Sequence, residues 1–307
     1  MDISVIIPTK DRSENLKRAI NSLFFQTILP DEIVIVDDGS KLLYDCVLKD
    51  LNTVNPGINI KYKKYDQCLG AAEARNIGAG LTSGEILMFL DDDDYWEKDK
   101  IKNQLVTFIN NPEIGLVYSA KIAVDEKGRF LYYIKSKKAD KNYSFSHTIL
   151  NFTRLGIGTT SAVAVRKAIF DKAGGFDRYL PARQDTELWA RISSLTKIAY
   201  VDSPDVYYTI SSKNNDQISG SVEKVNEANR LIIAKYNNEI SKLTLREKKK
   251  LKASFKLSVA KRYSSQNFFK AAWYSLQSFV LYPSTKSLVY LFPHKVINYF
   301  RSKRHRK

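Results

Sequence analysis

Apolar runs alternate with amphipathic segments over the first 120 residues of the chain. The segments "ISVIIP" (3–8), "DEIVIVDDGS" (31–40) and "GEILMFL" (84–90) contain continuous apolar stretches, as expected of strands buried on both faces of a sheet. Segment 13–27 instead places its apolar residues at helical spacing, with Ser13 as the expected N-cap. We therefore expect strands and helices to follow one another in this part of the chain.

Such alternation predicts an α/β fold, a doubly wound and mostly parallel sheet with helices on both faces. Further helices are predicted near 41–54 and over 70–81, with a strand over 58–65. Ligands of such folds bind beyond the carboxyl ends of the strands. This rule brings three polar segments to one rim of the sheet, namely Pro8–Asp11, Asp37–Ser40 and Asp91–Asp94.

The pattern changes after about residue 115. From there to about 210, β-rich segments are interrupted by short helical ones, including 183–194, and beyond 221 helical periodicity continues to about 302. A chain of 307 residues is long for one domain. We expect an α/β domain over 1–220 and a C-terminal helical region over 221–307.

The net charge of +16 lies entirely in the last part of the chain. Residues 241–307 hold 17 Lys and Arg but a single acid, Glu247, whereas residues 1–240 hold 32 basic and 32 acidic residues. Because the body is balanced, we do not expect nucleic acid as a partner. Basic helices with aromatic and aliphatic faces suit an anionic membrane surface. The alternative is a helical cap whose charge is only solvated.

Other features of composition restrict the class of protein. Two cysteines and three histidines are too few and too scattered for a disulfide framework or a zinc site. The first residues, "MDISVIIPTK", predict a strand rather than a signal peptide, and no uncharged apolar stretch approaches the roughly 20 residues of a membrane span. We therefore expect a cytoplasmic protein, held peripherally on the inner face of the plasma membrane.

The acidic run Asp91–Asp94 is the first candidate site, since four adjacent carboxylates repel one another unless a cation neutralises them. Mn²⁺ or Mg²⁺ is the expected cation, because hard divalent ions take oxygen ligands, commonly one or two carboxylates plus substrate phosphates. Alternate residues of an extended segment face the same way, which groups Asp91 with Asp93 and Asp92 with Asp94. A solvated acidic loop is the alternative.

Three further positions carry candidate polar groups. Asp38, with Asp37, ends a strand and can accept hydrogen bonds from a ribose or a base, although Asp37 serves equally well as a cap of the "DDGS" turn. Arg75 and Asn76 can meet phosphate or sugar oxygens. Asp185 begins a helix, where its anion is stabilised; it can act as a general base or only cap the helix.

Five motifs together resemble those of the family 2 glycosyltransferases, which are inverting enzymes with the GT-A fold. They occur in the order and spacing of that family over about residues 1–210, as "VIIPTKDR", "EIVIVDDGS", "GAAEARNIGAG", "GEILMFLDDDD" and "GGFDRYLPARQDTELWAR". The resemblance implies a nucleotide-sugar donor and a catalytic domain that holds it through a divalent metal.

The resemblance also implies roles for individual residues. Those expected to contact the donor are Pro8, Thr9, Asp38, Arg75 and Asp92. The metal-binding D-x-D pair matches Asp91 and Asp93, with Asp93 as the expected direct ligand. Asp185 matches the catalytic base that ends the family's "ED" motif. Gln184 precedes it in place of Glu, which removes one charge beside the base.

These roles predict a reaction in which a metal offsets charge on the departing nucleoside diphosphate while Asp185 takes the proton of an acceptor hydroxyl. The Q-x-x-R-W motif of processive relatives is missing, which favours transfer of one sugar. We expect a UDP-linked donor and a saccharide or lipid-linked acceptor in cell-surface polysaccharide or glycolipid synthesis, with residues 155–166 on the acceptor side. A nucleotidyltransferase and a catalytically silent sugar-nucleotide or membrane-binding module are the alternatives.

Overall fold

The computed structural model describes residues 1–41, 44, 57–136, 157–210, 221–293 and 296. The chain forms two compact units. The first, the α/β unit, comprises Met1–Asn142, Gly156–Arg178 and Gln184–Ile210. The second, the helical unit, comprises Tyr143–Leu155, Tyr179–Arg183 and Ser211–Lys307.

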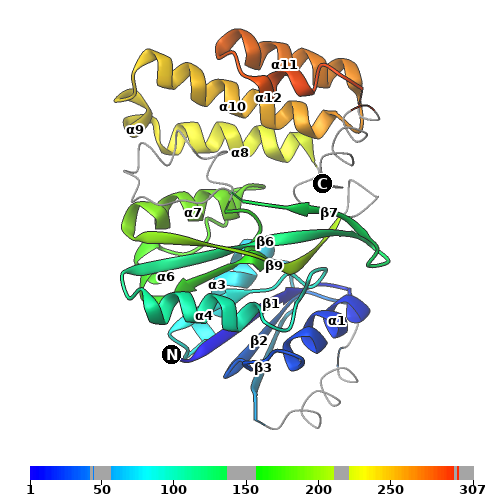
Figure 1. The fold of residues 1–307 in the computed structure, drawn as a ribbon, viewed down its shortest axis with the longest axis vertical. Helices are drawn as coiled ribbons and strands as arrows, with labels where there is room; N and C mark the ends of the chain where they lie inside the picture. The colour runs from blue at the N-terminus through cyan, green and yellow to red at the C-terminus, as the bar shows by residue number, and fades with distance from the viewer. Residues whose placement is uncertain (42–43, 45–56, 137–156, 211–220, 294–295, 297–307) are drawn as a thin grey trace. The chain divides into compact units, whose positions relative to one another are not determined.

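One sheet in the order β3-β2-β1-β4-β8-β6-β9-β5, with β7 also paired to β6, organises the α/β unit (Figure 1). Its strands are β1 (Ile3–Thr9), β2 (Glu32–Asp38), β3 (Asn59–Tyr65), β4 (Ile86–Phe89), β5 (Tyr95–Trp96), β6 (Ile114–Asp125), β7 (Phe130–Ile134), β8 (Val163–Arg166) and β9 (Lys197–Ile210). Strands β3, β2, β1 and β4 pair in parallel, as do β6 and β9. The predicted α/β fold with a mostly parallel sheet is confirmed. Strand β8 departs from it, because it lies antiparallel between β4 and β6.

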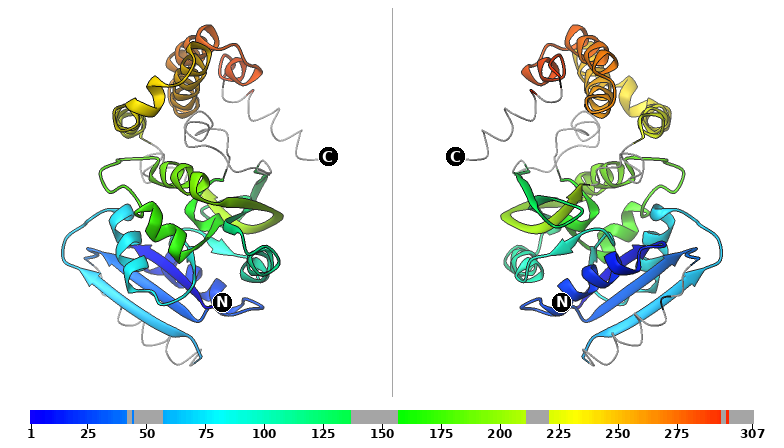
Figure 2. Two further views of the ribbon diagram at one scale, coloured as in Figure 1. Left: turned by 90° about the vertical axis from the view of Figure 1, so that its left-hand side faces the viewer. Right: turned by 90° about the vertical axis from the view of Figure 1, so that its right-hand side faces the viewer.

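Alternate residues of the central strands pack against helices on opposite faces of the sheet. Val5 of β1 belongs to a core cluster with residues of α1 (Ser13–Phe24) and α4 (Lys100–Asn110). Val34 of β2 instead packs toward α3 (Ala71–Leu81). Figure 2 shows α1 and α3 on the two sides of the parallel strands. The continuous apolar runs of the sequence follow from this double burial.

Helix α3 lies so close to β1 that only a glycine fits at one of its positions. A Cβ added at Gly78 would overlap Cγ2 of Ile6. Any larger side chain would move α3 away from the sheet, and with it Arg75, which α3 carries. The spacing between helix and strand thus decides where this arginine lies.

The remaining helical elements of the α/β unit are η1 (Thr160–Ala162), α6 (Lys167–Ala173) and α7 (Gln184–Leu195). Helix α7 packs against α6, β6 and β9.

The prediction of Ser13 as an N-cap is wrong, because Ser13 is the first residue of α1 and Arg12 occupies the cap position without a side-chain cap bond. The helix predicted near 41–54 falls outside the described residues except for Lys41 and Tyr44.

The helical unit contains α8 (Val222–Lys235), α9 (Asn237–Ser241), α10 (Leu245–Tyr263), α11 (Phe268–Leu281) and α12 (Thr285–Val289). Helix α10 packs against both α8 and α11 (Figure 1). Its start is fixed by a capping box, in which the backbone N–H of Thr244 donates to the Glu247 carboxylate at 2.9 Å. Helix α12 ends at Val289, ahead of Pro293, so the helical periodicity predicted to about 302 is interrupted there; residues 294, 295 and 297–302 lie outside the described residues. Among the described residues, no helix combines the length and apolarity required to cross a bilayer.

Candidate active site

The three strand ends predicted to converge do meet at one rim of the sheet. Thr9, the last residue of β1, donates from Oγ1 to Oδ2 of Asp92 at 2.9 Å. The backbone N–H of Asp11 donates to Oγ of Ser40 at 2.9 Å, and that of Lys41 donates to Oδ1 of Asp11 at 2.8 Å. These bonds join the loops after β1, β2 and β4, so the predicted convergence is confirmed.

A buried tyrosine supports the loop after β1. The hydroxyl of Tyr44, a residue only 1% exposed, accepts a hydrogen bond from the backbone N–H of Arg12 at 2.9 Å. It also accepts from Oγ of Ser40 at 3.3 Å and lies 3.5 Å from Oγ1 of Thr9. Pro8 is buried within β1, one residue before Thr9.

Asp37 shapes the turn that follows β2. Its Oδ1 accepts from the backbone N–H of Ser40 at 2.8 Å, and its Oδ2 accepts from the hydroxyl of Tyr62 at 2.7 Å. The carboxylate is fully buried. The turn-capping interpretation of Asp37 therefore describes its role in this structure, rather than contact with a ribose or base.

Asp38 fixes the loop that leads into α3. Its carboxylate accepts from the backbone N–H groups of Leu69 and Gly70 at 2.6 and 2.9 Å. Gly39 follows with a φ of +79°, and a Cβ there would lie 2.9 Å from the backbone nitrogen of Cys68. A glycine is required, since this backbone conformation and this close approach both exclude a side chain. Asp38 thus holds the C-terminal end of β2 against the start of α3.

The acidic run forms a turn in which the backbone N–H of Asp94 donates to the carbonyl of Asp91 at 3.0 Å. The expectation of an extended backbone is therefore wrong for residues 92 and 93. Exposure nevertheless alternates as expected. The side chains of Asp91 and Asp93 are 26% and 22% exposed, that of Asp92 is 8% exposed, and Asp94 is buried. Two carboxylates thus face outward and two face inward.

One guanidinium nitrogen bridges two carboxylates of the turn. Nη1 of Arg12 donates to Oδ1 of Asp92 and to Oδ2 of Asp93, both at 3.1 Å. Burial raises the pKa of Asp92 to about 6, with the charge of Asp93 adding to the rise and that of Arg12 opposing it. Burial, with the charge of Asp91, also raises the pKa of Asp93. The turn therefore favours positive charge beyond what Arg12 supplies.

A second arginine reaches the turn from α3. Nη2 of Arg75 donates to Oδ1 of Asp91, and its guanidinium carbon lies 5.5 Å from the ring centroid of Phe176. Oγ1 of Thr160 donates to the other oxygen of Asp91 at 2.9 Å. Arginines from two different elements therefore flank the outward carboxylates.

Asp94 is held entirely by the protein. Its carboxylate accepts from Oγ of Ser161 at 2.6 Å and from the backbone N–H of Thr209 at 2.9 Å. Burial raises its pKa well above the ordinary value, with the charges of Asp93 and Asp91 adding to the rise.

The expectation that the whole of 155–166 lines an acceptor is wrong in part, because Val163–Val165 are buried within the sheet. Residues 155 and 156 lie outside the described residues.

Asp185 lies in the first turn of α7. Its Oδ1 accepts from the backbone N–H of Thr186 at 2.6 Å and from its hydroxyl at 3.1 Å. Its Oδ2 accepts no hydrogen bond from the part of the chain that the structure describes. The residue is half-buried.

Two sets of contacts hold α7, the helix that carries Asp185, in place. Glu187 is fully buried and pairs with Arg191 through two bonds of 2.9 and 2.6 Å, while Nη2 of Arg191 donates to the carbonyl of Gly175 at 2.7 Å. Trp189 packs on Phe89 of β4, with ring centroids 6.4 Å apart. Because β4 leads into the acidic turn, these contacts fix α7 relative to that turn.

A buried lysine lies within the electrostatic reach of Asp185 and of Asp94 in the acidic turn. Lys121 lies on β6 and is 4% exposed. Burial lowers its pKa to about 8, against the opposing attraction of the Asp185 and Asp94 carboxylates. Lys121 therefore supplies positive charge to both acidic groups.

Sequence reasoning missed Arg12, Tyr44 and Lys121. Arg12 ends the quoted motif "VIIPTKDR", and Lys121 interrupts an otherwise apolar strand, so both carried a signal. The suggestion that Asn76 meets a ligand is wrong. Its side-chain amide accepts from the backbone N–H of Phe176 and donates to the carbonyl of the same residue, both at 2.8 Å.

The described residues contain no group of three or more acidic, histidine or cysteine side chains arranged to hold a metal by themselves. Asp91 and Asp93 nevertheless offer two outward carboxylates on one turn. Mg²⁺ and Mn²⁺ often take only one or two protein carboxylates and complete their coordination with phosphate and water. The residues present therefore fit a divalent ion whose site is completed by a diphosphate.

Residues 4–174 match the model of glycosyl transferase family 2. This match covers more than half of the chain, which therefore belongs to glycosyl transferase family 2. An uncharacterised glycosyltransferase of Rickettsia conorii is 30% identical over 203 residues, covering 66% of this chain and 33% of the relative. The amylovoran biosynthesis glycosyltransferase AmsB of Erwinia amylovora is 26% identical over 232 residues, covering 73% of this chain and 75% of AmsB.

The chain spans about a third of the length of the first two curated relatives it matches. Among solved structures, residues 1–349 of TarS from S. aureus match with a TM-score of 0.53 and 19% identity, covering 94% of this chain and 91% of that one. Structures of the same TarS fragment with UDP and with UDP-GlcNAc also match. At this identity the likeness shows the fold, which is GT-A-like with a C-terminal helical region.

Proposed function

We propose that the chain transfers a single sugar from a UDP-linked donor to a hydroxyl of a saccharide or lipid-linked acceptor, with inversion at the anomeric carbon. One observation carries the proposal: the outward carboxylates of Asp91 and Asp93 stand at the strand ends with an arginine paired to each. TarS has been solved with UDP and UDP-GlcNAc, which supports a UDP-linked donor. AmsB is named for amylovoran biosynthesis, which supports a role in polysaccharide synthesis.

In this proposal the donor nucleotide lies at the ends of β1 and β2. Pro8, Thr9 and Asp38 lie at this rim, where Thr9 provides a hydroxyl and Asp38 a carboxylate. Asp92 is buried and bonded to Thr9 and Arg12, so it contributes to donor binding by holding these two residues. Sequence similarity to the family's nucleotide-contacting positions supports the same placement.

We assign Asp91 and Asp93 as ligands of Mn²⁺ or Mg²⁺, with Asp93 as the direct ligand. Such an ion, when bound, offsets negative charge on the departing nucleoside diphosphate. Arg12 and Arg75 already lie beside these carboxylates. Their guanidinium groups suit the oxygens of a diphosphate, so they add positive charge where the leaving group develops its own.

Asp185 acts as the general base of the proposed reaction. Its Oδ2, which accepts no hydrogen bond from the described residues, takes the proton of the acceptor hydroxyl, and the start of α7 stabilises its anion. The acceptor oxygen bonds to the anomeric carbon as the bond from that carbon to the donor phosphate breaks. The nucleoside diphosphate leaves with the bonding electrons. Because the acceptor oxygen attacks from the face opposite the leaving group, the configuration inverts, and no covalent enzyme intermediate is needed.

We further propose that the protein works in the cytoplasm, on the inner face of the plasma membrane, in the synthesis of a cell-surface polysaccharide or glycolipid. The helical unit supports this, because residues 241–307 hold 17 basic residues and one acidic residue. Anionic lipids of the cytoplasmic leaflet attract such a surface, at about 1 kcal/mol per basic residue close to it. Lipid-linked acceptors would be found at the same surface.

The test is an assay with a panel of nucleotide sugars and saccharide or lipid-linked acceptors, with and without Mn²⁺. The proposal predicts release of UDP with one donor, dependence on the metal, and a product of opposite anomeric configuration by NMR. Retention of configuration would overturn the assigned mechanism. Release of pyrophosphate would indicate nucleotidyl transfer, and donor binding without turnover would indicate a catalytically silent module.

A further inference from the structure

Helix α11 carries large apolar side chains on its outer face. Phe269, Trp273, Leu276 and Val280 are 82%, 59%, 46% and 75% exposed. Their spacing of four, three and four residues places them on one side of the helix, where they form a stripe along its length. We call these four residues the α11 stripe. An apolar row of this size on a helix surface is typical of a binding surface.

The inner face of the same helix is built from small residues. Ala271, Ser275 and Ser278 are buried. Oγ of Ser278 donates to the carbonyl of Ala253 on α10 at 2.8 Å, and Oγ of Ser275 donates to the carbonyl of Ser287 on α12. The helix therefore reverses the usual pattern, since it packs on its neighbours through small residues and turns its large apolar residues outward.

Basic side chains lie along one flank of α11. The sequence contains no acidic residue after Glu247. Nζ of Lys256 lies 5.2 Å from the ring centroid of Tyr274, and Nζ of Lys270 lies 5.3 Å from that of Tyr263. Helices α11 and α12 carry no acidic side chain, although the charge of Lys270 acts on the Glu223 carboxylate of α8. The surface thus combines the apolar stripe with a basic flank.

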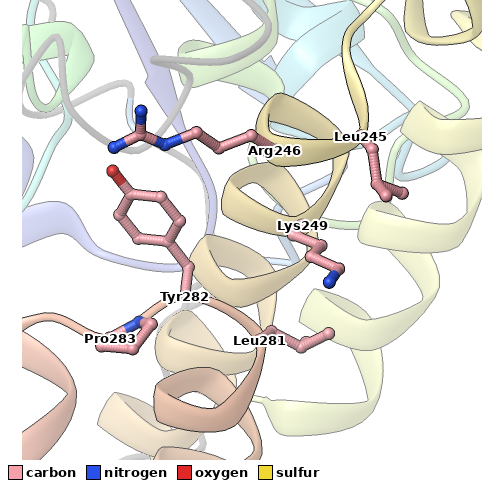
Figure 3. A pocket seen from close by; sticks show the side chains of 6 residues that line it. All are labelled: Leu245, Arg246, Lys249, Leu281, Tyr282 and Pro283. Carbon is pink, nitrogen blue, oxygen red and sulfur yellow. The ribbon is translucent and has the colours of Figure 1, made fainter.

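A pocket lies at the C-terminal end of α11, where the stripe ends. Its volume is about 590 Å³, and it is lined by Leu245, Arg246, Lys249, Leu281, Tyr282 and Pro283. Figure 3 shows these side chains coming from the start of α10 and the end of α11. In Figure 3 Arg246 lies beside Tyr282 while Lys249 points toward Leu281, so each cation stands next to an aromatic or apolar side chain, a pairing that suits the phosphate and acyl chain of a lipid.

We propose that the α11 stripe and its terminal pocket dock onto a bilayer containing anionic phospholipids. This inference rests on the proposed membrane partner and names the surface that meets it. Apolar side chains enter the boundary between headgroups and acyl chains, while flanking lysines and arginines meet lipid phosphates. A second copy of the chain fits less well, because it would bring two strongly basic surfaces together.

The test uses the full chain and vesicles of phosphatidylcholine with and without phosphatidylglycerol. Trp273 is a natural probe, because Trp96 and Trp189 are only 4% and 1% exposed. The proposal predicts a blue shift of tryptophan emission and protection from iodide quenching with the anionic vesicles. The triple variant Phe269→Ser/Leu276→Ser/Val280→Ser keeps the probe and should bind these vesicles about tenfold or more weakly.

A matched control replaces three exposed apolar residues of the α/β unit, Phe25→Ser/Val106→Ser/Phe130→Ser, whose exposures are 77%, 46% and 55%. This control should bind vesicles as the unaltered chain does. Circular dichroism melting shows whether each triple variant remains folded. A second variant, Arg246→Gln/Lys249→Gln, should reduce the preference for anionic over neutral vesicles.

The outcomes separate the two proposals. If the unaltered chain ignores anionic vesicles, the membrane partner itself is refuted, and this inference with it. If the chain binds them and the folded stripe variant binds equally well, the stripe is not the docking surface, although membrane binding stands. If the stripe variant changes only the sedimentation behaviour of the chain, a second copy occupies the surface and the inference is overturned.

Discussion

Arg75 on α3 and Asp91 at the end of β4 form an ion pair whose side chains are 11% and 26% exposed. The pair joins the face of the sheet covered by α3 to the rim that carries the acidic turn. It places a cation beside an outward carboxylate, at the position where we propose that the donor diphosphate binds. The other outward carboxylate, that of Asp93, forms an ion pair with Arg12.

Replacing Arg75 should therefore weaken turnover more than folding. We expect Arg75→Gln to lower kcat/KM by about 10²-fold, the usual cost of removing one preorganised donor from a developing charge. Arg129→Gln is the control, since Arg129 also pairs with an aspartate but its side chain is 74% exposed. Steady-state kinetics measures the effect, with the donor that the nucleotide-sugar panel selects. Equal activity of both variants would remove Arg75 from the donor site.

Replacing the proposed base should abolish chemistry and leave the fold intact. Asp185→Asn keeps an oxygen that can accept from the backbone N–H of Thr186, so its melting temperature should change little. Its kcat should fall by roughly 10²–10⁴-fold, the usual contribution of a general base. Asp171→Asn, at an exposed position of α6, is the control. A fully active Asp185→Asn enzyme would show that another group takes the proton.

Divalent metal binding should weaken as the pH falls, because burial and the charge of Asp91 raise the pKa of Asp93, the proposed direct ligand. Burial raises the pKa of Asp92 to about 6, so its ionised form opposes folding above that pH and its protonation favours folding below it. An added cation favours the ionised carboxylates, and protons compete with it. We expect Mn²⁺ to raise the melting temperature at pH 7 and to have little effect at pH 5.

The variant Asp92→Asn tests the source of this pH dependence. Removing the buried carboxylate should raise the stability of the metal-free protein at pH 7 relative to the unaltered chain, with a smaller difference at pH 5. Differential scanning calorimetry at both pH values measures it. A stabilising effect of Mn²⁺ that is as large at pH 5 as at pH 7 would contradict a carboxylate site at this turn.

A buried lysine away from the rim should cost stability at neutral pH. Lys100 is fully buried, 3.9 Å from the ring centroid of Trp96, and burial lowers its pKa to about 7 while Asp205 opposes the shift. Its folded-state pKa lies below the unfolded value, so stability rises with pH between about 7 and the ordinary lysine pKa. Lys100→Met should stabilise the protein by about 1–4 kcal/mol at or below pH 7.

The same variant should lose the pH dependence that Lys100 causes. The gain from Lys100→Met should shrink as the pH rises from 7 toward 10, because the lysine is then neutral in the folded protein. Lys98→Met, at an exposed position, is the control and should change neither quantity. Urea unfolding at several pH values gives the free energies. A destabilised Lys100→Met protein would indicate that the cation–π contact with Trp96 outweighs the cost of burial.

Sequence periodicity predicted most of the α/β unit, because the strands that carry the rim are buried on both faces and leave continuous apolar runs. The convergence of Thr9, Asp38 and the acidic turn followed from one topological rule about parallel strands. The same reasoning did not foresee the direction of β8, since an antiparallel strand between β4 and β6 has the same apolar pattern as a parallel one. Ser13 was misplaced by one residue because helix ends depend on local backbone angles.

What the sequence alone determined is which carboxylates reach the rim, because position at a strand end is a local property. The tertiary structure decided their partners. Arg12 meets Asp92 and Asp93, and the side-chain amide of Asn76 bonds to the backbone of Phe176. These pairings join segments distant in sequence, so they depend on strand order and side-chain packing, which local periodicity does not encode. The tertiary structure also decided which side of α11 faces outward, because contact with α10 selects the side that is buried.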